Sequence, residues 1–237
     1  MDLLTGLIDW LSDPARWSGP DSIPVRVFEH VVLSGLPVLV AIGLAVPVGL
    51  AIGHTGRLRL LVVTLANIGR ALPTFALLVI FLPIVLRLGL GLGFWPTFLP
   101  LLLLAIPPIL VNTYVAISEV DRDTREAARA MGMRPLQVLL RVELPLGLPL
   151  IFAGVRIATV QVIATATLGA IVASGGLGRY IVDGLALRQD ERIVVGAVLV
   201  ALLALAADRL LGMLERRAGP AQTAASEAAP GQLVQPA

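Results

Sequence analysis

Long charge-free stretches dominate the pattern of this sequence and predict its fold. The stretches that contain no Asp, Glu or Arg cover residues 30–56, 71–86, 88–118, 157–178 and 193–207. A helix needs about 20 mostly apolar residues to cross the hydrocarbon core of a membrane, where a charge is costly. The pattern therefore predicts an all-α polytopic membrane protein. Its five expected transmembrane helices cover about 29–53, 60–86, 97–118, 146–172 and 191–212.

The second predicted span is the least regular, because it contains Asn67, Arg70 and Pro73. Either one tilted helix breaks near Pro73, or two short segments lie there and the number of spans is six. Prolines also predict kinks in the first and third spans, at Pro37, Pro47, Pro107 and Pro108. A kinked helix needs neighbours that satisfy its freed backbone groups. The prolines therefore favour a helix bundle around a pathway over a simple anchor.

A polar segment separates the third and fourth predicted spans; from Asp123 it reads DTREAARAMGMRPLQVLLRVELP. We predict that Asp123 caps a short helix and that Glu126, three residues later, completes a capping box. The alanines that follow are strong helix formers. Gly132 suits the left-handed residue that ends a helix, and Pro135 suits the first turn of the next one. Two short helices with a bend between them are therefore expected at the membrane surface.

A glycine-rich segment, ASGGLGR from Ala173, follows the fourth predicted span. A phosphate-binding loop would follow a strand and contain Gly-Lys-Ser/Thr, and the sequence offers neither feature here. The glycines instead favour a tight re-entrant turn near the outer mouth of a pathway. The residues expected to form this outer turn are Gly175, Gly176 and Gly178.

Several polar residues fall within the predicted spans. Polar side chains inside a helix bundle either make interhelical hydrogen bonds or line a pathway, and the sequence leaves both roles open. The candidates for lining a pathway are Asn112, Gln161, Thr165 and Thr167. Arg70 and Arg156 also fall within or near spans, where a charge is a functional hypothesis. The competing interpretation is a structural ion pair or a side chain that reaches the membrane interface.

The composition agrees with a membrane protein and excludes several other classes. The chain of 237 residues is 57% hydrophobic and 14% charged, with a mean hydropathy of +0.90. Soluble domains carry roughly 25% charged residues. The net charge is +2, and all 18 basic residues are arginines scattered between apolar runs, which is unlike a nucleic-acid-binding face. Cysteine is absent, so disulfides and thiolate metal sites are excluded.

No catalytic or metal-binding set stands out in the sequence. His30 and His54 lie at the two ends of the first predicted span, with no carboxylate at metal-ligand spacing. The chain holds neither a nucleotide-binding loop nor a grouped Ser, His and Asp. We therefore expect that it is not an enzyme and that it binds no metal.

The arginine distribution predicts the orientation, since cytoplasmic loops are enriched in Lys and Arg. With the 119–145 loop in the cytoplasm, five spans place ten arginines inside and six outside. This favours an extracytoplasmic N-terminus and a cytoplasmic C-terminus, whereas six spans would put both ends inside. No basic region precedes the first apolar stretch, so we expect no cleaved signal peptide.

The expected organisation has three parts. Residues 1–28 form an extracytoplasmic N-terminal segment. Residues 29–217 form the transmembrane domain, which contains the cytoplasmic loop 119–145. The tail, 218–237, is rich in Ala, Pro, Gln and Ser and is expected to be disordered.

The polar loop resembles a motif of a known family. It holds Glu126-Ala127-Ala128, then Gly132 after three residues, Val142 after nine more and Leu144-Pro145 after one more. This spacing resembles the EAA loop of permease subunits from binding-protein-dependent ABC importers, onto which a separate ATPase subunit docks. The resemblance covers about 29–217 and is closest to the osmoprotectant branch, the uptake permeases for glycine betaine, carnitine and choline. Further segments that carry it are 66–68, 72–73, 144–156, 164–167, 175–178 and 207–217.

This resemblance implies the type I ABC importer permease fold and a permease subunit in the bacterial cytoplasmic (inner) membrane, working by alternating access. The implied partners are an ABC ATPase subunit, an extracytoplasmic substrate-binding protein, membrane lipid, and a second permease subunit that is identical or different. ATP and magnesium would bind the ATPase subunit, so this chain itself would hold no cofactor. The implied ATPase-coupling residues are Glu126, Ala127, Ala128, Gly132, Leu144 and Pro145.

Other functions stay open at this point. Methionine-type permeases share much of the pattern, so the cargo is either an osmoprotectant or another small solute such as an amino acid. A stand-alone secondary carrier would show inverted repeats with matched broken helices, and no such repeat is visible in the sequence. A membrane-embedded enzyme would need a catalytic set that the predicted spans lack.

Overall fold

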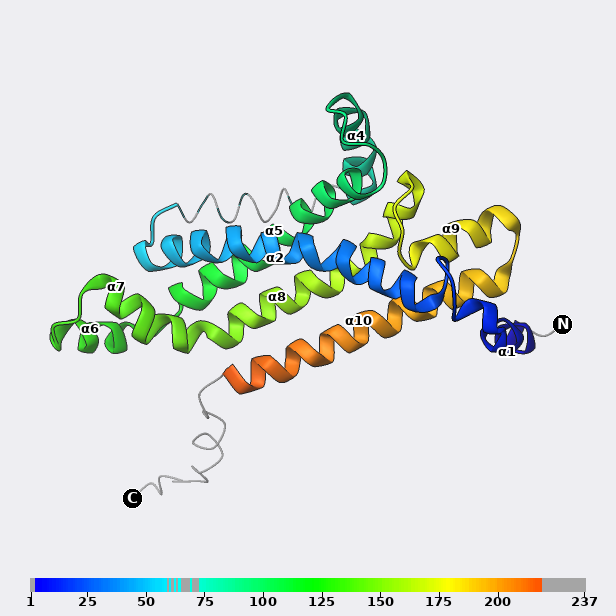
Figure 1. Ribbon diagram of the computed structural model, residues 1–237. Helices are drawn as coiled ribbons and strands as arrows, with labels where there is room; N and C mark the ends of the chain where they lie inside the picture. Colours follow the sequence, from blue (N-terminus) through cyan, green and yellow to red (C-terminus); the bar gives the residue numbers. More distant parts are fainter. Residues whose placement is uncertain are drawn as a thin grey trace, which may run out of the picture.

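The computed structural model describes residues 3–58, 60, 62, 64, 69 and 73–218, and every regular element in this part of the chain is a helix (Figure 1). The longer helices are α2 (Ile23–Thr55), α4 (Thr74–Arg87), α5 (Phe94–Ser118), α8 (Leu144–Ala166) and α10 (Asp190–Ala218). The shorter ones are α1 (Leu3–Ser12), α6 (Arg122–Ala130), α7 (Pro135–Val138) and α9 (Gly178–Leu187). Tighter 3₁₀ turns lie at Pro14–Arg16 and Thr167–Val172, and a π-helical turn lies at Leu139–Glu143.

Four helices among the described residues are long and apolar enough to cross a membrane: Ile23–Thr55, Phe94–Ser118, the continuous run Pro135–Val172, and Asp190–Arg217. They correspond to the first, third, fourth and fifth predicted spans, which are confirmed. Observed helices extend past the charge-free runs because charges near helix ends find partners. At the start of α2, for example, Arg26 lies 2.8 Å from the Glu29 carboxylate one turn later.

The second predicted span is divided at Pro73. This residue is extended (φ −65°, ψ 120°) and precedes α4, whose 14 residues are fewer than the roughly 20 that a membrane span needs. Helical backbone before the break is described at Leu60, Val62, Thr64 and Gly69. The predicted break is confirmed. Asn67 and Arg70, on which the choice between five and six spans also depends, lie outside the described residues, as does the predicted tail from residue 219 onward.

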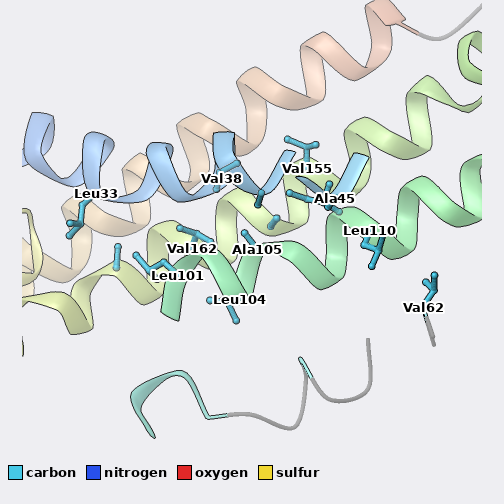
Figure 2. Packing of buried hydrophobic residues seen from close by; sticks show 14 of the residues in the cluster. Leu33, Val38, Ala45, Val62, Leu101, Leu104, Ala105, Leu110, Val155 and Val162 are labelled. Atoms are coloured by element: carbon cyan, nitrogen blue, oxygen red, sulfur yellow. The ribbon is translucent and has the colours of Figure 1, made fainter. Parts of the chain in front are cut away.

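The centre of the bundle is formed by α2, α5 and α8 (Figure 2). Ala41, Ala105 and Ala158 are almost fully buried where these helices meet. Small residues let helix backbones approach closely, which matters in lipid because apolar tails compete for the same surfaces. Gly49 of α2 shows how close the approach is: a Cβ atom there would lie 2.7 Å from the Cβ of Thr113 in α5.

A second buried cluster joins the N-terminal segment to α9 and α10, with Tyr180 at its centre. The Tyr180 ring meets Trp10 of α1 edge-on, with centroids 5.5 Å apart, and its hydroxyl donates to the Asp21 carbonyl at 2.8 Å. Burial raises the pKa of this hydroxyl, so it remains a donor. The charge-free pattern does not predict α1 or α9, because both are short, carry charges and are held by contacts between distant parts of the chain.

Helices α2, α5, α8 and α10 run alongside one another and give the bundle two distinct ends (Figure 1). One end holds α1, α9 and the start of α2. The opposite end holds α6, α7 and the C-terminal end of α2, and α10 runs toward it. The predicted outer turn and the predicted polar loop are thus at opposite ends of the molecule, as the orientation argument from arginines requires.

Candidate functional site

The polar loop folds into α6, a bend and α7, and its first helix begins earlier than predicted. Asp121, not Asp123, is the N-cap: its Oδ1 accepts the backbone N–H of Thr124 at 2.8 Å. That hydrogen bond lowers the pKa of the Asp121 carboxyl. The prediction of Asp123 was wrong because α5 ends at Ser118, so α6 can start as soon as Asp121 turns the chain. Asp123 lies in the first turn, where a negative charge favours the helix dipole.

The bend at Gly132 follows the prediction. Its φ is +83°, the left-handed conformation that glycine adopts without a Cβ penalty. The Gly132 N–H donates to the Arg129 carbonyl at 2.9 Å, and the Met133 N–H donates to the Ala128 carbonyl at 3.2 Å. This pair of bonds is the Schellman arrangement that satisfies the last carbonyls of a helix. The chain therefore reverses sharply after α6.

The second short helix is continuous with the fourth span. Pro135 occupies the first turn of α7, and the Arg134 N–H is satisfied by the Gln137 side chain at 2.8 Å. The chain then widens into the π-helical turn before Leu144 and Pro145 begin α8. Pro145 has no N–H, and its ring would clash with a carbonyl four residues back in a regular helix. The wider turn lets the helix pass this proline without breaking.

The tip of the loop presents polar and apolar groups together. Glu126 and Ala127 are exposed, whereas Ala128 is buried against the rest of the molecule. The apolar side chains of Met131 and Leu136 are 74% and 63% exposed on either side of the bend. Exposed apolar side chains grouped beside charges are typical of protein contact sites. Glu126 is oriented by Arg122, whose Nε lies 2.7 Å from its Oε1.

Sequence reasoning missed a buried charge cluster beneath this loop. The Glu143 side chain is fully buried, although it belongs to the loop whose polarity suggested exposure. His54 Nδ1 lies 2.6 Å from Glu143 Oε2, and Arg125 Nε lies 3.0 Å from Glu143 Oε1. The arginine contact is close in distance but poorly aligned for a hydrogen bond, so we treat it as an ion pair. The partners come from α2, α6 and the π-helical turn.

The predicted outer turn is closely packed at the other end of the bundle. A Cβ on Gly175 would lie 2.3 Å from the Glu29 carboxylate, and one on Gly178 would lie 2.3 Å from the Thr167 carbonyl. Gly176 has φ +82°, and its N–H donates to Glu29 Oε2 at 2.7 Å. Gly176 is thus required by its backbone conformation and Gly178 by contact with backbone atoms, whereas a side chain at Gly175 would have to displace the Glu29 carboxylate.

Further hydrogen bonds fix this outer turn to α2 and to the start of α5. The Leu177 N–H donates to His30 Nδ1 at 3.3 Å, so His30 Nε2 carries the proton and donates to the Ile163 carbonyl at 2.9 Å. The Ser174 hydroxyl donates to the Gly93 carbonyl at 2.9 Å. Neither Glu29 nor His30 was predicted to hold this turn, because both partners lie 147 residues away in the sequence.

Two of the four predicted pathway residues share one cavity. Asn112 and Gln161 line a hollow of about 440 Å³ between α5, α8 and the Pro73 break. Its other walls include Pro107 and Pro108, and the Asn112 amide donates to the Pro108 carbonyl at 2.8 Å. Leu104, Val111 and Ile157 add apolar surface to the hollow, so its lining among the described residues combines neutral polar groups, prolines and apolar side chains.

Thr165 and Thr167 are not brought into that cavity. The Thr165 hydroxyl donates to the Gln161 carbonyl at 2.7 Å, and the Thr167 hydroxyl donates to the Ala164 carbonyl at 2.8 Å. Both hydroxyls thus bond within their own helix, a common arrangement for threonine in helices. The structure gives these two threonines a local role, so Asn112 and Gln161 are the two predicted pathway residues that line the hollow.

Arg156 is part of an ion-pair group between α8 and α10. Its guanidinium contacts Asp208 in a two-pronged arrangement at 2.6 and 2.8 Å, and Glu215 at 3.4 Å. This geometry supports the structural interpretation of Arg156. A second hollow of about 470 Å³ lies beside the pair, and its walls combine Arg156, Asp208 and Gln161 with the apolar side chains of Ala153, Ile157 and Val160. Arg70, the other arginine predicted to lie near a span, is outside the described residues.

Comparison with known proteins assigns the family. Residues 43–220 match the protein family described as binding-protein-dependent transport system inner membrane component. The chain belongs to this family. It is therefore a membrane component of an ABC transport system of that kind, located in the inner membrane. The helical bundle and the loop spacing agree with this assignment.

Individual relatives cover most of the chain. It is 37% identical over 196 residues to the choline transport system permease protein OpuBB of Bacillus subtilis. The aligned region covers 83% of this chain and 88% of that protein. It is 38% identical over 221 residues to the carnitine transport permease protein OpuCD of Listeria monocytogenes, covering 93% and 95% of the two chains. Both relatives are transport permeases by name, as the sequence resemblance predicts.

A solved structure supports the fold independently. The inward-facing MetNI methionine ABC transporter is similar with a TM-score of 0.74 at 24% sequence identity, over 88% of this chain and 100% of that chain. At this identity the likeness establishes the fold alone. The predicted type I ABC importer permease fold is thereby confirmed.

Proposed function

We propose that this chain is the permease subunit of an ATP-driven importer for small quaternary-ammonium osmoprotectants such as glycine betaine, carnitine or choline. The relatives named for choline and carnitine transport are 37% and 38% identical to it over most of its length. Another relative of Bacillus subtilis, named for glycine betaine, carnitine and choline together, is 38% identical over 192 residues. This agreement among relatives is the observation that carries the choice of cargo.

The α6–α7 bend would be the docking site of the ATPase subunit. It projects from the end of the bundle (Figure 1), with Glu126 and Ala127 exposed beside the exposed side chains of Met131 and Leu136. A partner groove would bury the apolar side chains and orient itself on the carboxylate. ATP and magnesium would bind that partner, so this chain would hold no cofactor and catalyse no hydrolysis. Leu144 and Pro145 would connect the docking site directly to α8.

The complete transporter would contain two permease subunits, two ATPase subunits and an extracytoplasmic binding protein. The permease pair would be either two copies of this chain or this chain and a similar one. The binding protein would deliver cargo at the end that carries α1, α9 and the outer turn. ATP binding would move the docked bends, open the pathway outward and release the cargo into the bundle.

The hollow lined by Asn112 and Gln161 would be part of the pathway. Its described lining is uncharged, with apolar walls beside the neutral polar groups, and this suits a zwitterion or a fixed cation because neither would meet a strong counter-ion there. Weak binding at this point would let the cargo leave quickly, which transport requires. The aromatic cages that recognise quaternary ammonium groups through cation–π contacts would then belong to the binding protein.

Uptake measurements test the choice of cargo. The complex of this chain with its ATPase subunit and binding protein is reconstituted in liposomes, and uptake of labelled glycine betaine, choline and methionine is compared. Saturable uptake of an osmolyte, with methionine excluded, is the expected result. Uptake of methionine and of neither osmolyte would instead assign the chain to an amino-acid importer.

A further inference from the structure

We propose that Glu143 is a positioning residue that transmits displacement of the docking bend to the membrane-spanning helices. The proposal rests on the proposed function, since it takes the α6–α7 bend to be where an ATPase subunit docks. Glu143 itself would touch neither ATP nor cargo. It would act through the ion pairs that join α6 and α2 to the start of α8.

Because Glu143 is buried, losing one of these contacts would be energetically costly. Glu143 is the one acidic side chain that is buried among the described residues. A carboxylate removed from water is stable only when it is paired and hydrogen-bonded. Its two partners approach from separate helices, His54 at 2.6 Å and Arg125 at 3.0 Å. Separating either helix from Glu143 would therefore leave a buried charge without its partner, so the three elements are expected to move together.

Arg125 extends the connection to a fourth helix. Its guanidinium also donates to the carbonyl of Ile117, in the last turn of α5. Arg125, in α6 of the docking bend, therefore contacts both α5 and Glu143. His54 lies in the last turn of α2. The cluster thus joins the ends of α2 and α5 to the docking helix and to α8.

The surrounding backbone leaves little slack between these helix ends. A Cβ on Gly53 of α2 would lie 2.7 Å from the Cβ of Ile117, and one on Gly147 of α8 would lie 3.1 Å from the Ala116 carbonyl. Close-packed helices have low compressibility, so a displacement of one helix end is transmitted to its neighbours. Glu143 itself ends the π-helical turn, a local irregularity that often marks functional positions in helices.

The exposed ion pair on the same helix offers a contrast. Arg122 and Glu126 are 2.7 Å apart, with side chains 88% and 56% exposed. Water screens such a pair and keeps its contribution small. It also lies within α6, so it cannot connect that helix to another. Of these two groups, the Arg125–Glu143–His54 cluster is the one that has both the burial and the connectivity that transmission needs.

The test separates docking from transmission in the reconstituted complex of this chain, its ATPase subunit and binding protein. The variants are Glu143→Gln, Arg125→Gln and the double variant, with Glu119→Gln as an exposed carboxylate control at the same end of the molecule. Three quantities are measured: ATPase co-purification, ATP hydrolysis, and osmolyte uptake per ATP hydrolysed. If wild-type protein neither retains the ATPase nor transports, the proposed function fails and the result says nothing specific about Glu143.

Glu143→Gln is expected to retain the ATPase and to hydrolyse ATP while uptake per ATP falls about tenfold, the size expected for one lost charge-assisted hydrogen bond. The double variant should fall no further than Glu143→Gln, because the two residues act through one contact. Glu119→Gln should behave as wild type. A loss of ATPase association, or equal losses of hydrolysis and uptake, would overturn the proposal. If Glu143→Gln does not accumulate in the membrane, Arg125→Gln is used in its place, because it leaves the His54 contact intact. Its osmolyte uptake per ATP hydrolysed then tests the proposal.

Discussion

At the residue scale, glycines of this protein are required for two different physical reasons. Gly132 needs its left-handed backbone, with φ +83° and nothing within 4 Å of a Cβ built there. Gly178 has an ordinary backbone, yet a Cβ there would press on the Thr167 carbonyl at 2.3 Å. The first position therefore penalises a side chain through conformation, and the second through overlap with backbone atoms.

Replacing Gly132 with valine should strain the bend and turn α7 away from α6. Valine is β-branched and rarely adopts positive φ. We expect normal membrane insertion with reduced uptake, and a milder loss for Gly132→Asn, since asparagine tolerates this conformation better. Uptake and the amount of protein in the membrane fraction are measured together. Normal uptake and normal ATPase association in the valine variant would argue against α6–α7 as the coupling segment.

Replacing Gly178 with alanine should destabilise the fold itself. The free energy of unfolding is expected to fall by about 1–3 kcal/mol, the usual cost of overpacking. The matched control is Gly43→Ala in α2, where nothing lies within 4 Å of the added Cβ and alanine favours the helix. Thermal unfolding in detergent compares the two variants. Equal midpoints for both would show that the outer turn relaxes around a side chain.

At the element scale, four of the five spans predicted from the long charge-free runs are span-length helices among the described residues, because the membrane tolerates few charges in a span. Local rules also predicted the bend at Gly132 and the start of α7 at Pro135. They placed the α6 cap two residues late, since Asp121 and Asp123 are both suitable caps and only the end of α5 decides between them. Contacts between distant residues escaped prediction: His54 and Glu143 are 89 positions apart.

The ion pair between Arg156 of α8 and Asp208 of α10 is predicted to stabilise the contact between these two helices. Removing Arg156 alone, as Arg156→Met, leaves the Asp208 carboxylate without its two-pronged partner beside an apolar hollow. We expect a lower unfolding midpoint in detergent. The double variant Arg156→Met, Asp208→Asn should recover part of the loss, because no unpaired charge remains. A double variant less stable than the single one would show that Arg156 acts apart from Asp208.

At the scale of the whole molecule, the two ends of the bundle are held by separate clusters of polar contacts. One end holds the outer turn through Glu29 and His30, and the other holds the α6–α7 bend, the proposed docking site, through Glu143. α2 carries residues of both clusters along one continuous helix of 33 residues. Fold and family can be predicted from the sequence pattern. The contacts that α2 makes with the outer turn at one end and with Glu143 at the other are seen only in the folded chain.

Orientation in the membrane is a prediction at this same scale. The excess of arginines on the side of the docking bend predicts a cytoplasmic C-terminus and an extracytoplasmic N-terminus. A reporter fused to each end in turn, read in intact cells, measures this directly. Both termini on the cytoplasmic side would indicate six spans in place of five.

The dependence of transport on ATP tests the central claim most directly. Uptake of labelled glycine betaine and choline is measured in proteoliposomes that hold this chain alone, or this chain with its ATPase subunit and binding protein, each with and without ATP. We predict uptake of at least one osmolyte only when the ATPase subunit, the binding protein and ATP are all present. Uptake by the chain alone, driven by an ion gradient, would contradict its assignment as an importer subunit and favour a stand-alone carrier.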